Sequence, residues 1–266
     1  MRISIVQSSL HWENPEANRE MLAQKLAPLR GHTDLVILPE MFTTGFSMNT
    51  ESLAEPMNGP TMDWLGDISR DLNAAVSGSF ICVEEGKCFN RLIFMRPDGQ
   101  FDFYDKKHLF TLTMENQHFV AGKKRLTVEW LGWRICPFIC YDLRFPAWSR
   151  NNSPTSNGPT SNVPYDILIY VANWPNRRAH HWRSLLTARA IENQSFVVGV
   201  NRTGSDGNGF EYSGDSAIID YSGQSLAQIS DGKEDVVTVE ISLEDLHAYR
   251  RQLPFLADAD AFEIKI

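Results

Sequence analysis

Cys140 is the residue that the sequence best places to act as a nucleophile. Residues 134–139 (RICPFI) have the character of a strand, whereas residues 141–146 (YDLRFP) leave strand periodicity abruptly. A thiol at such a junction projects from the end of a sheet, beside backbone N–H groups that can stabilise an oxyanion. A buried structural thiol is the commoner role of an arbitrary cysteine, so position alone leaves both roles open.

A thiol nucleophile needs a proton acceptor, and Glu40 is the outstanding candidate. It directly follows Pro39 and the continuous apolar run at residues 34–38 (DLVIL), which predicts a buried strand ending at the carboxyl edge of a sheet. A partly desolvated carboxylate can accept a thiol proton near neutral pH. A surface acid or helix cap is the commoner role of a single glutamate.

Histidine is the alternative base, as in papain-like enzymes. The plausible histidines are His108, His118, His180 and His181. None of them has a local setting comparable to that of Glu40, so each is predicted to be a helix-surface or structural residue.

Two lysines, Lys106 and Lys107, end an expected strand within residues 104–110 (YDKKHLF). A fixed ammonium group stabilises an oxyanion and favours a neighbouring thiolate. Because a lysine pair at a strand end is normally a solvated sheet edge, this pattern alone is weak evidence for a catalytic cation.

Composition and charge exclude several classes of protein. The chain has 266 residues, 42% of them hydrophobic, and a net charge of -8. These values predict one large soluble domain and no nucleic-acid partner, because polyanion binding requires clustered basic residues. No apolar run approaches the roughly 18 residues that span a membrane, and strand periodicity begins at once without signal-peptide features. We therefore expect a cytoplasmic protein.

The four cysteines predict neither a disulfide nor a metal site. Cys82 and Cys88 lie in apolar strand-like segments, and Cys136 and Cys140 are four positions apart, unlike the closer pairs of zinc knuckles and redox motifs. Reduced thiols are expected.

Strand and helix patterns alternate along the chain and must position these residues. Helices are expected from residues 14–15 onward, over 61–75 and over 179–194. Strands are expected at 3–7, 34–38, several antiparallel ones within 76–106, a hairpin within 126–140, and single strands at 166–172, 195–201, 216–221 and 235–241. This mixture predicts an α/β fold of two packed sheets with helices outside.

Residues 151–164 (NNSPTSNGPTSNVP) are almost purely polar and turn-forming, so they cannot contribute to a core. Strand patterns of the same type stand on both sides of this segment. We therefore predict an exposed insertion within one domain, residues 1–266, rather than a linker between two domains.

Together these segments resemble the nitrilase, or carbon–nitrogen hydrolase, superfamily, whose catalytic Glu, Lys and Cys lie in this chain order. Residues 38–42 (LPEMF), 104–110 and 139–146 (ICYDLRFP) carry the three motifs. The family's lysine stands two residues before the histidine, which selects Lys106. Its second active-site glutamate stands seven residues before a glycine, which selects Glu115. Similarity continues through residues 172–175 (ANWP), 188–194 (ARAIENQ) and 201–204 (NRTG).

The resemblance is greatest to the omega-amidases, which hydrolyse the terminal amide of 2-oxoglutaramate and related monoamides. Residues 41–46 (MFTTGF), 173–175 and 181–182 carry this finer likeness. The substrate-binding residues that it suggests are Phe46, Arg144, Trp174 and Arg202. For the substrate carboxylate, Arg177 and Arg178 remain alternatives to Arg144 and Arg202.

The resemblance also implies a fold, an assembly and a mechanism. It implies an αββα sandwich that pairs into a homodimer, with the tail at residues 253–266 crossing the interface. It implies no metal or organic cofactor: Glu40 is the base, Cys140 attacks the amide, and Lys106 and the Tyr141 backbone N–H bind the oxyanion. The open alternatives are a nitrilase or carbamoylase that uses the same residues, and an idle interaction module that keeps the fold.

Overall fold

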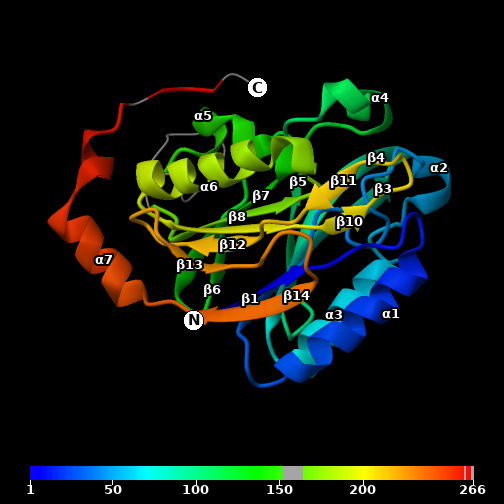
Figure 1. Ribbon diagram of the computed structural model, residues 1–266, viewed down its shortest axis with the longest axis horizontal. Helices are drawn as coiled ribbons and strands as arrows, with labels where there is room; N and C mark the ends of the chain where they lie inside the picture. Colours follow the sequence, from blue (N-terminus) through cyan, green and yellow to red (C-terminus); the bar gives the residue numbers. More distant parts are fainter. Residues whose placement is uncertain (152–163, 261, 265–266) are drawn as a thin grey trace.

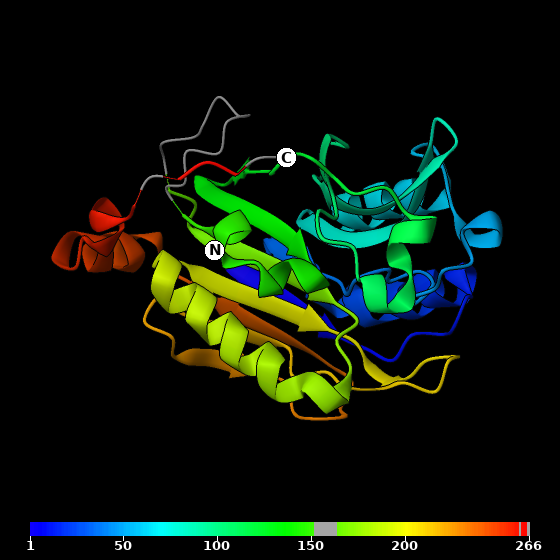
Figure 2. The same cartoon turned by 90° about the horizontal axis from the view of Figure 1, so that it is seen from above.

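The computed structural model describes residues 1–151, 164–260 and 262–264. Two mixed sheets of six strands each pack face to face, and helices cover both outer sides, which gives a four-layer αββα sandwich (Figures 1 and 2). Helices α1 (Pro15–Leu26) and α3 (Pro60–Leu72) cover the first sheet, and α6 (Ala179–Asn193) covers the second. The predicted fold class is confirmed.

The first sheet has the spatial order β14 (Asp235–Glu240), β1 (Arg2–Gln7), β2 (Leu35–Ile37), β3 (Ala75–Glu84), β4 (Lys87–Met95) and β5 (Phe101–Asp105). The second has the order β13 (Ser225–Gln228), β12 (Ala217–Ile219), β9 (Phe196–Asn201), β8 (Ile167–Ala172), β7 (Trp133–Ile139) and β6 (Val128–Trp130). A separate hairpin pairs β10 (Thr203–Ser205) with β11 (Glu211–Ser213).

The remaining elements are short and connect or flank the sheets. The α-helices among them are α2 (Thr50–Leu53), α4 (Glu115–His118), α5 (Pro146–Ser149) and α7 (Leu243–Gln252). The 3₁₀ helices are η1 (Ala27–Leu29), η2 (Thr111–Thr113), η3 (Cys140–Arg144), η4 (Asn176–Arg178) and η5 (Phe255–Asp258).

Strand β2 shows why both faces of each sheet are apolar. Successive side chains of a strand point to opposite faces. Leu35 and Ile37 join the core between the two sheets, whereas Val36 and Leu38 pack in the core under α1 and α3. A continuous apolar run, rather than an alternating one, is what a strand buried on both faces requires.

The direction of the strands brings the predicted site residues to one edge. Strands β1, β2 and β3 run parallel, and so do β7, β8 and β9. Strand β5 runs in the same direction as β3, because each is antiparallel to β4. The carboxyl ends of β2, β5 and β7 are followed by Glu40, Lys106 and Cys140, and parallel strands collect such residues at one edge of a sheet.

Most of the expected elements form, with shifted ends. Helix α1 begins where predicted because the Asn14 side chain accepts a hydrogen bond from the Ala17 N–H (3.1 Å). Helix α3 ends at Leu72 instead of continuing to Ala75, because Asn73 takes a left-handed conformation and ends the helix.

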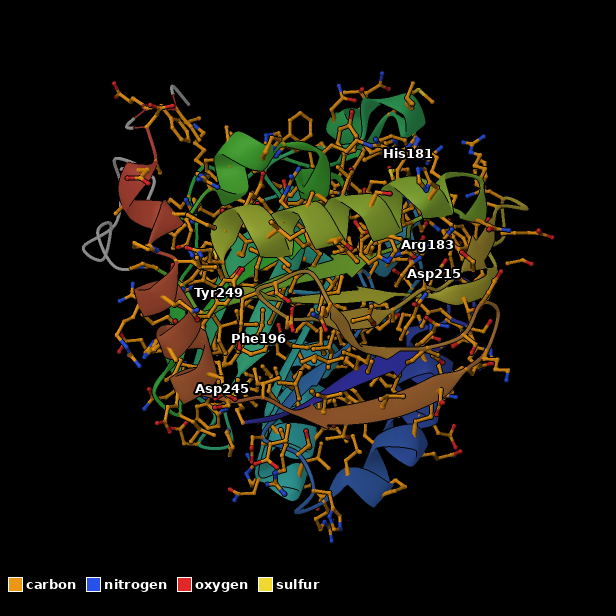
Figure 3. All side chains as sticks on the ribbon, turned by 60° about the vertical axis from the view of Figure 1, so that its left-hand side comes forward. His181, Arg183, Phe196, Asp215, Asp245 and Tyr249 are labelled. Atoms are coloured by element: carbon orange, nitrogen blue, oxygen red, sulfur yellow. The ribbon has the colours of Figure 1, made fainter. Side chains whose placement is uncertain are left out.

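Several short elements were not predicted. The β10–β11 hairpin and β13 have strands of three or four residues, too short for a clear periodicity. Helix α7 was also missed. It packs on the second sheet, where the Tyr249 ring lies 4.6 Å from Tyr221 and the Tyr221 ring lies 5.2 Å from Phe196 (Figure 3).

Residues 152–163 of the predicted insertion lie outside the described residues. The two ends that border this segment are joined directly. The Asn151 side chain accepts a hydrogen bond from the Tyr165 N–H (2.9 Å) and donates one to the Tyr165 carbonyl oxygen (3.0 Å). Strand β8 therefore begins beside the residue at which the preceding chain segment ends.

All four cysteines are free thiols, as predicted, with Cys82 and Cys136 fully buried in strands. Among the described residues, no helix has the length and apolar character needed to cross a membrane.

Candidate active site

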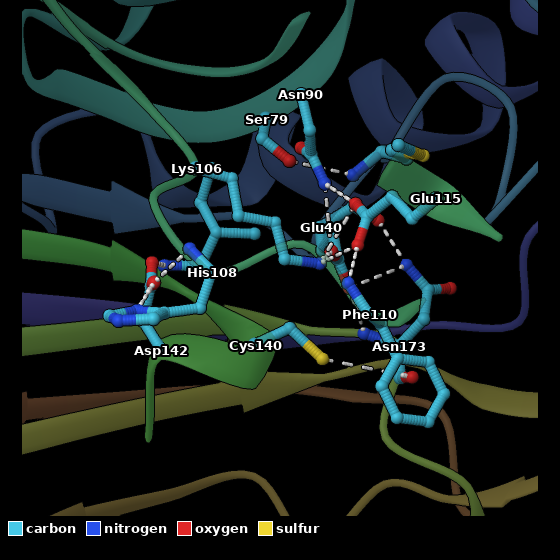
Figure 4. Close-up of polar contacts among 12 residues, drawn as sticks. Glu40, Ser79, Asn90, Lys106, His108, Phe110, Glu115, Cys140, Asp142 and Asn173 are labelled. Carbon is cyan, nitrogen blue, oxygen red and sulfur yellow. Dashed lines mark hydrogen bonds and ion pairs between the residues drawn. The ribbon is translucent and has the colours of Figure 1, made fainter. Parts of the chain in front are cut away.

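Glu40 lies fully buried at the edge of the first sheet and receives hydrogen bonds on both carboxylate oxygens (Figure 4). Oε1 accepts from Lys106 Nζ (2.8 Å) and from Asn90 Nδ2 (2.9 Å). Oε2 accepts from the Asn173 backbone N–H (2.8 Å). Asn173 also donates its side-chain N–H to the Glu40 carbonyl oxygen (2.6 Å). The side chain is thus held in one orientation by both sheets.

Lys106 joins Glu40 to a second buried carboxylate. Its Nζ lies 3.0 Å from both carboxylate oxygens of Glu115, and both side chains are fully buried. Glu115 also accepts hydrogen bonds from the Phe110 N–H (2.5 Å) and from Asn90 Nδ2 (3.3 Å). The sequence-predicted Glu40, Lys106 and Glu115 are therefore in direct contact.

The buried cluster holds two carboxyl groups and one ammonium group, and this imbalance shifts pKa values. Burial raises the pKa of Glu115, an effect that the charge of Lys106 opposes and that of Glu40 reinforces. Burial alone would lower the pKa of Lys106, but the charges of Glu115 and Glu40 raise it above its ordinary value. The two carboxyl groups therefore favour the charged form of Lys106.

Cys140 stands at a sharp turn where β7 passes directly into η3. Its φ of 44° is in the left-handed region, which a residue other than glycine adopts only when its surroundings enforce it. Asp142 accepts a hydrogen bond from the Ile139 N–H (3.1 Å), and Arg189 of α6 donates one to the Leu143 carbonyl oxygen (2.6 Å). The predicted cysteine elbow forms and is held from two sides.

The Cys140 thiol is partly buried, with its Sγ 4.0 Å from the Asn173 carbonyl oxygen. Burial raises the pKa of Cys140 well above its ordinary value, and the negative charge of Glu40 raises it further. Lys106 acts in the opposite direction without cancelling these effects. Together these effects favour the neutral Cys140 thiol over the thiolate.

A cavity of about 600 Å³ opens above the thiol. Its wall includes Cys140, Lys106, Phe46, Tyr141 and Trp174. The other lining residues are Trp12, Glu13, Ser47, Met48, Asn49, Phe110, Thr113, Arg144, Asn173, Pro175, Arg177, Arg178, Asp206, Asn208, Phe210 and Tyr212. Aromatic walls with a few polar groups suit a small organic ligand.

Three of the four predicted substrate-binding residues line this cavity. The Phe46 ring centre lies 5.1 Å from Lys106 Nζ, and the Arg144 guanidinium stacks 4.7 Å above the Trp174 ring.

Arg202, the fourth, is not among the described residues that line the cavity, and its role in substrate binding stays a prediction. Its fully buried guanidinium donates to the carbonyl oxygens of Thr203 (3.0 Å) and Ser205 (2.7 Å) and lies 4.8 Å from the Tyr212 ring. The side chain turns back under its own hairpin, so Arg202 supports the wall and does not form its surface.

His108, the histidine nearest to the lysine in sequence, is held away from any role as a free base. Its ring Nδ1 lies 2.7 Å from the Asp142 carboxylate, and its ring stacks on Phe145 with 3.7 Å between centres. The prediction of a structural histidine agrees with this geometry.

Sequence reasoning missed two asparagines that hold the carboxylates. Asn90 contacts both Glu40 and Glu115, and Asn173 contacts Glu40 through both its backbone and its side chain. Asn90 left a detectable sign, because it is an amide in the apolar strand β4 and a fully buried polar side chain requires partners. The β10–β11 hairpin, which supplies Asp206, left no such sign in the sequence.

No group of three or more His, Cys, Asp or Glu side chains in the described ranges is arranged to hold a metal ion.

Comparison with known proteins places this geometry in a family. The family model for carbon-nitrogen hydrolases matches residues 2–251. The chain is 43% identical to omega-amidase YafV of Yersinia enterocolitica over 98% of both chains, and 33% identical to 2-oxoglutaramate amidase of Bacillus subtilis over 96% of both.

A solved structure supports the same family assignment. XC1258 of Xanthomonas campestris, a CN-hydrolase superfamily protein with an arsenic adduct in its active site, is 46% identical to this chain. The TM-score is 0.94, with 100% of this chain and 99% of the other covered. The chain therefore belongs to the carbon–nitrogen hydrolase family.

Proposed function

We propose that this amidohydrolase cleaves the terminal amide of a small oxo-dicarboxylic acid monoamide, such as 2-oxoglutaramate, through a thioester on Cys140. The observation that carries the proposal is the buried contact of Lys106 with Glu40 and Glu115, together with the position of Lys106 and Cys140 in the wall of one cavity. The substrate class is supported by the names of the relatives, omega-amidase and 2-oxoglutaramate amidase.

Glu40 starts the reaction as general base. Because burial and the charge of Glu40 disfavour the Cys140 thiolate, the thiol proton passes to Glu40 as Sγ attacks the amide carbon. The Glu40 carboxylate is oriented by Lys106, Asn90 and Asn173, so little reorganisation is needed for it to accept that proton.

Lys106 stabilises the oxyanion of the tetrahedral intermediate. An ammonium group has three N–H donors. Without substrate, Nζ contacts Glu40 Oε1 and both oxygens of Glu115, so one donor turns from Glu115 to the oxyanion when it forms. The Tyr141 backbone N–H, at the start of η3, is the second proposed donor.

The second half of the reaction reverses the role of Glu40. It protonates the departing ammonia as the C–N bond breaks, and then removes a proton from water as the water attacks the thioester carbonyl. Collapse of this second intermediate breaks the C–S bond, releases the acid and returns the proton from Glu40 to Cys140 Sγ. Glu115 keeps Lys106 in place throughout. Phe46, Arg144 and Trp174 form the substrate wall.

Purified Cys140→Ala protein tests this mechanism. It should release no ammonia from 2-oxoglutaramate, while mass spectrometry of the acid-quenched native enzyme should detect an acyl group on Cys140. Cys88→Ala is the matched control, because Cys88 is a free thiol on β4 that does not line the cavity among the described residues. Ammonia release by Cys140→Ala would refute the proposed nucleophile.

A substrate panel tests the proposed amide. Turnover should be highest with 2-oxoglutaramate and lower with glutamine, a simple nitrile and a carbamoyl amino acid. Preference for the nitrile or the carbamoyl compound would instead make the chain a nitrilase or carbamoylase, and absence of turnover and thioester with every compound would make it an idle module.

We also propose one hydrolase domain over residues 1–266, a homodimer and a cytoplasmic location. A core cluster that draws on both sheets supports the single domain. The exposed Phe255 in the tail supports the dimer. The four free thiols support a location in a reducing compartment. Light scattering tests the dimer, which a monomeric mass would contradict.

A further inference from the structure

We propose that Arg178 is the specificity-determining residue that binds the substrate carboxylate, so that the enzyme selects acidic amides over neutral ones. This inference rests on the proposed function and identifies a second chemical group in the wall of the same cavity. Arg178 lies in η4, which follows β8. In this proposal it pairs with the carboxylate end of the substrate, and the amide end lies at Cys140.

Three guanidinium groups line the cavity that contains the thiol, and each lies against an aromatic ring. Arg144 lies 4.7 Å from the ring centre of Trp174, Arg177 lies 5.2 Å from that of Phe210, and Arg178 lies 5.5 Å from that of Phe110. None of the three forms an ion pair with any described residue. The wall therefore presents positive charge that no described acid neutralises by direct contact.

The free-energy cost of leaving these positive charges unpaired is greatest at Arg178. Burial lowers the pKa of its guanidinium, and the positive charges of Arg177 and Arg144 lower it further. Among the described residues, none is recorded as accepting a hydrogen bond from its side chain, and its guanidinium lies over the Phe110 ring. A partly desolvated cation without a counterion is unfavourable, and a bound carboxylate relieves both the desolvation and the mutual repulsion.

The other two arginines are less suited to be the main partner. Arg144 already donates a hydrogen bond to His181 Nδ1 (3.1 Å), a residue at the start of α6 (Figure 3). Arg177 is exposed to solvent and lies against Phe210, which is itself 36% exposed. Water screens an exposed guanidinium, so its attraction for a carboxylate is weaker.

Phe110 links Arg178 to the catalytic cluster. The ring that supports Arg178 also packs on Tyr141 with 5.0 Å between ring centres, and the Phe110 N–H donates to Glu115. Arg178 is also coupled electrostatically to Cys140. Arg178 and Cys140 line the same cavity, so one substrate can place its carboxylate at Arg178 and its amide carbon at the thiol.

Two substrates and two matched variants test the inference. The substrates are 2-oxoglutaramate and 4-oxopentanamide, which has a methyl group where the first has its carboxylate. Arg178→Met should lower kcat/KM for 2-oxoglutaramate by about 10- to 100-fold, mainly through KM, since a charge-assisted pair is lost. Activity on 4-oxopentanamide should change by less than about threefold, and Arg178→Lys should recover part of the loss.

Arg177→Met is the matched control, because it removes the same group from the adjacent residue of η4. Its effect on 2-oxoglutaramate should be clearly smaller. An equal loss on both substrates in Arg178→Met, or a larger loss in Arg177→Met, would overturn the inference. Circular dichroism and alkylation of Cys140 verify that each variant is folded.

Binding separates this inference from the proposed function. In a Cys140→Ala background, calorimetry should detect binding of 2-oxoglutarate, the product acid. Adding Arg178→Met should abolish that binding. If the native enzyme released ammonia from neither amide, the proposed function would fail, and binding that Arg178→Met leaves intact would refute the carboxylate subsite as well.

Discussion

The carboxylate of Asp142 accepts two hydrogen bonds from His108, one from its backbone N–H (3.0 Å) and one from its ring Nδ1 (2.7 Å). Asp142 lies two residues after Cys140, and His108 lies two residues after Lys106. The same carboxylate accepts hydrogen bonds from Ile139 N–H and from Tyr104 Oη (2.8 Å). One buried acid therefore sets the nucleophile and the lysine relative to each other.

Asp142→Asn is expected to misplace the two segments together. The amide places an NH₂ donor where a native carboxylate oxygen accepts hydrogen bonds, so donors lose their acceptor and the free energy of unfolding should fall by about 2–4 kcal/mol. A shift of about 1 Å at the site should lower kcat about 10- to 100-fold. Urea denaturation and steady-state kinetics measure both effects. Tyr104→Phe removes one donor to Asp142 and the acceptor of the Lys107 and Trp148 N–H groups but keeps the carboxylate, so its loss of kcat should be smaller. Unchanged kcat in Asp142→Asn would refute the positioning role.

Lys106→Met should lower kcat by about 100- to 1000-fold, because an oxyanion donor is lost. It should also lower the free energy of unfolding by about 3–5 kcal/mol, since Glu40 and Glu115 remain buried without their cation. Adding Glu115→Gln should recover stability without recovering activity. Lys107→Met is the control and should retain turnover; equal loss in both lysine variants would contradict the assignment to Lys106.

Glu40→Gln should abolish turnover while making the thiol easier to ionise. Burial and the negative charge of Glu40 together raise the pKa of Cys140. A neutral glutamine removes the second effect, so the thiolate should form at lower pH than in the native enzyme. The pH profile of iodoacetamide alkylation, followed by mass spectrometry of the Cys140 peptide, measures this. A profile displaced to higher pH would mean that Glu40 promotes ionisation of the thiol at rest.

Gly207→Ala should disturb substrate binding more than chemistry. An added Cβ would lie 2.3 Å from Trp12 Nε1, so Trp12 or the β10–β11 hairpin must move, and both contribute to the cavity wall. Such overpacking costs about 1–3 kcal/mol, and we expect a KM several times higher with nearly native kcat. Gly66→Ala in α3, where nothing lies within 4 Å, is the control; equal KM in both variants would exclude this wall from substrate binding.

Local patterns predicted much of the fold and the centre of the site. The apolar run before Glu40 and the break in periodicity at Cys140 are visible along the chain, because a strand and its end depend on neighbouring residues. The three-residue strands β10 and β11 have no such pattern, and the cavity wall that they build was therefore not predicted.

The sequence alone determined which residue types stand at the ends of buried strands, and in what order: Glu40, Lys106 and Cys140. The tertiary structure decided their partners, because Asn90 and Asn173 reach Glu40 from 50 and 133 residues away. It also turned Arg202 beneath the wall and left Arg178 facing the cavity. These outcomes depend on strand order and on how the two sheets pack, and local periodicity carries no information about contacts across that distance.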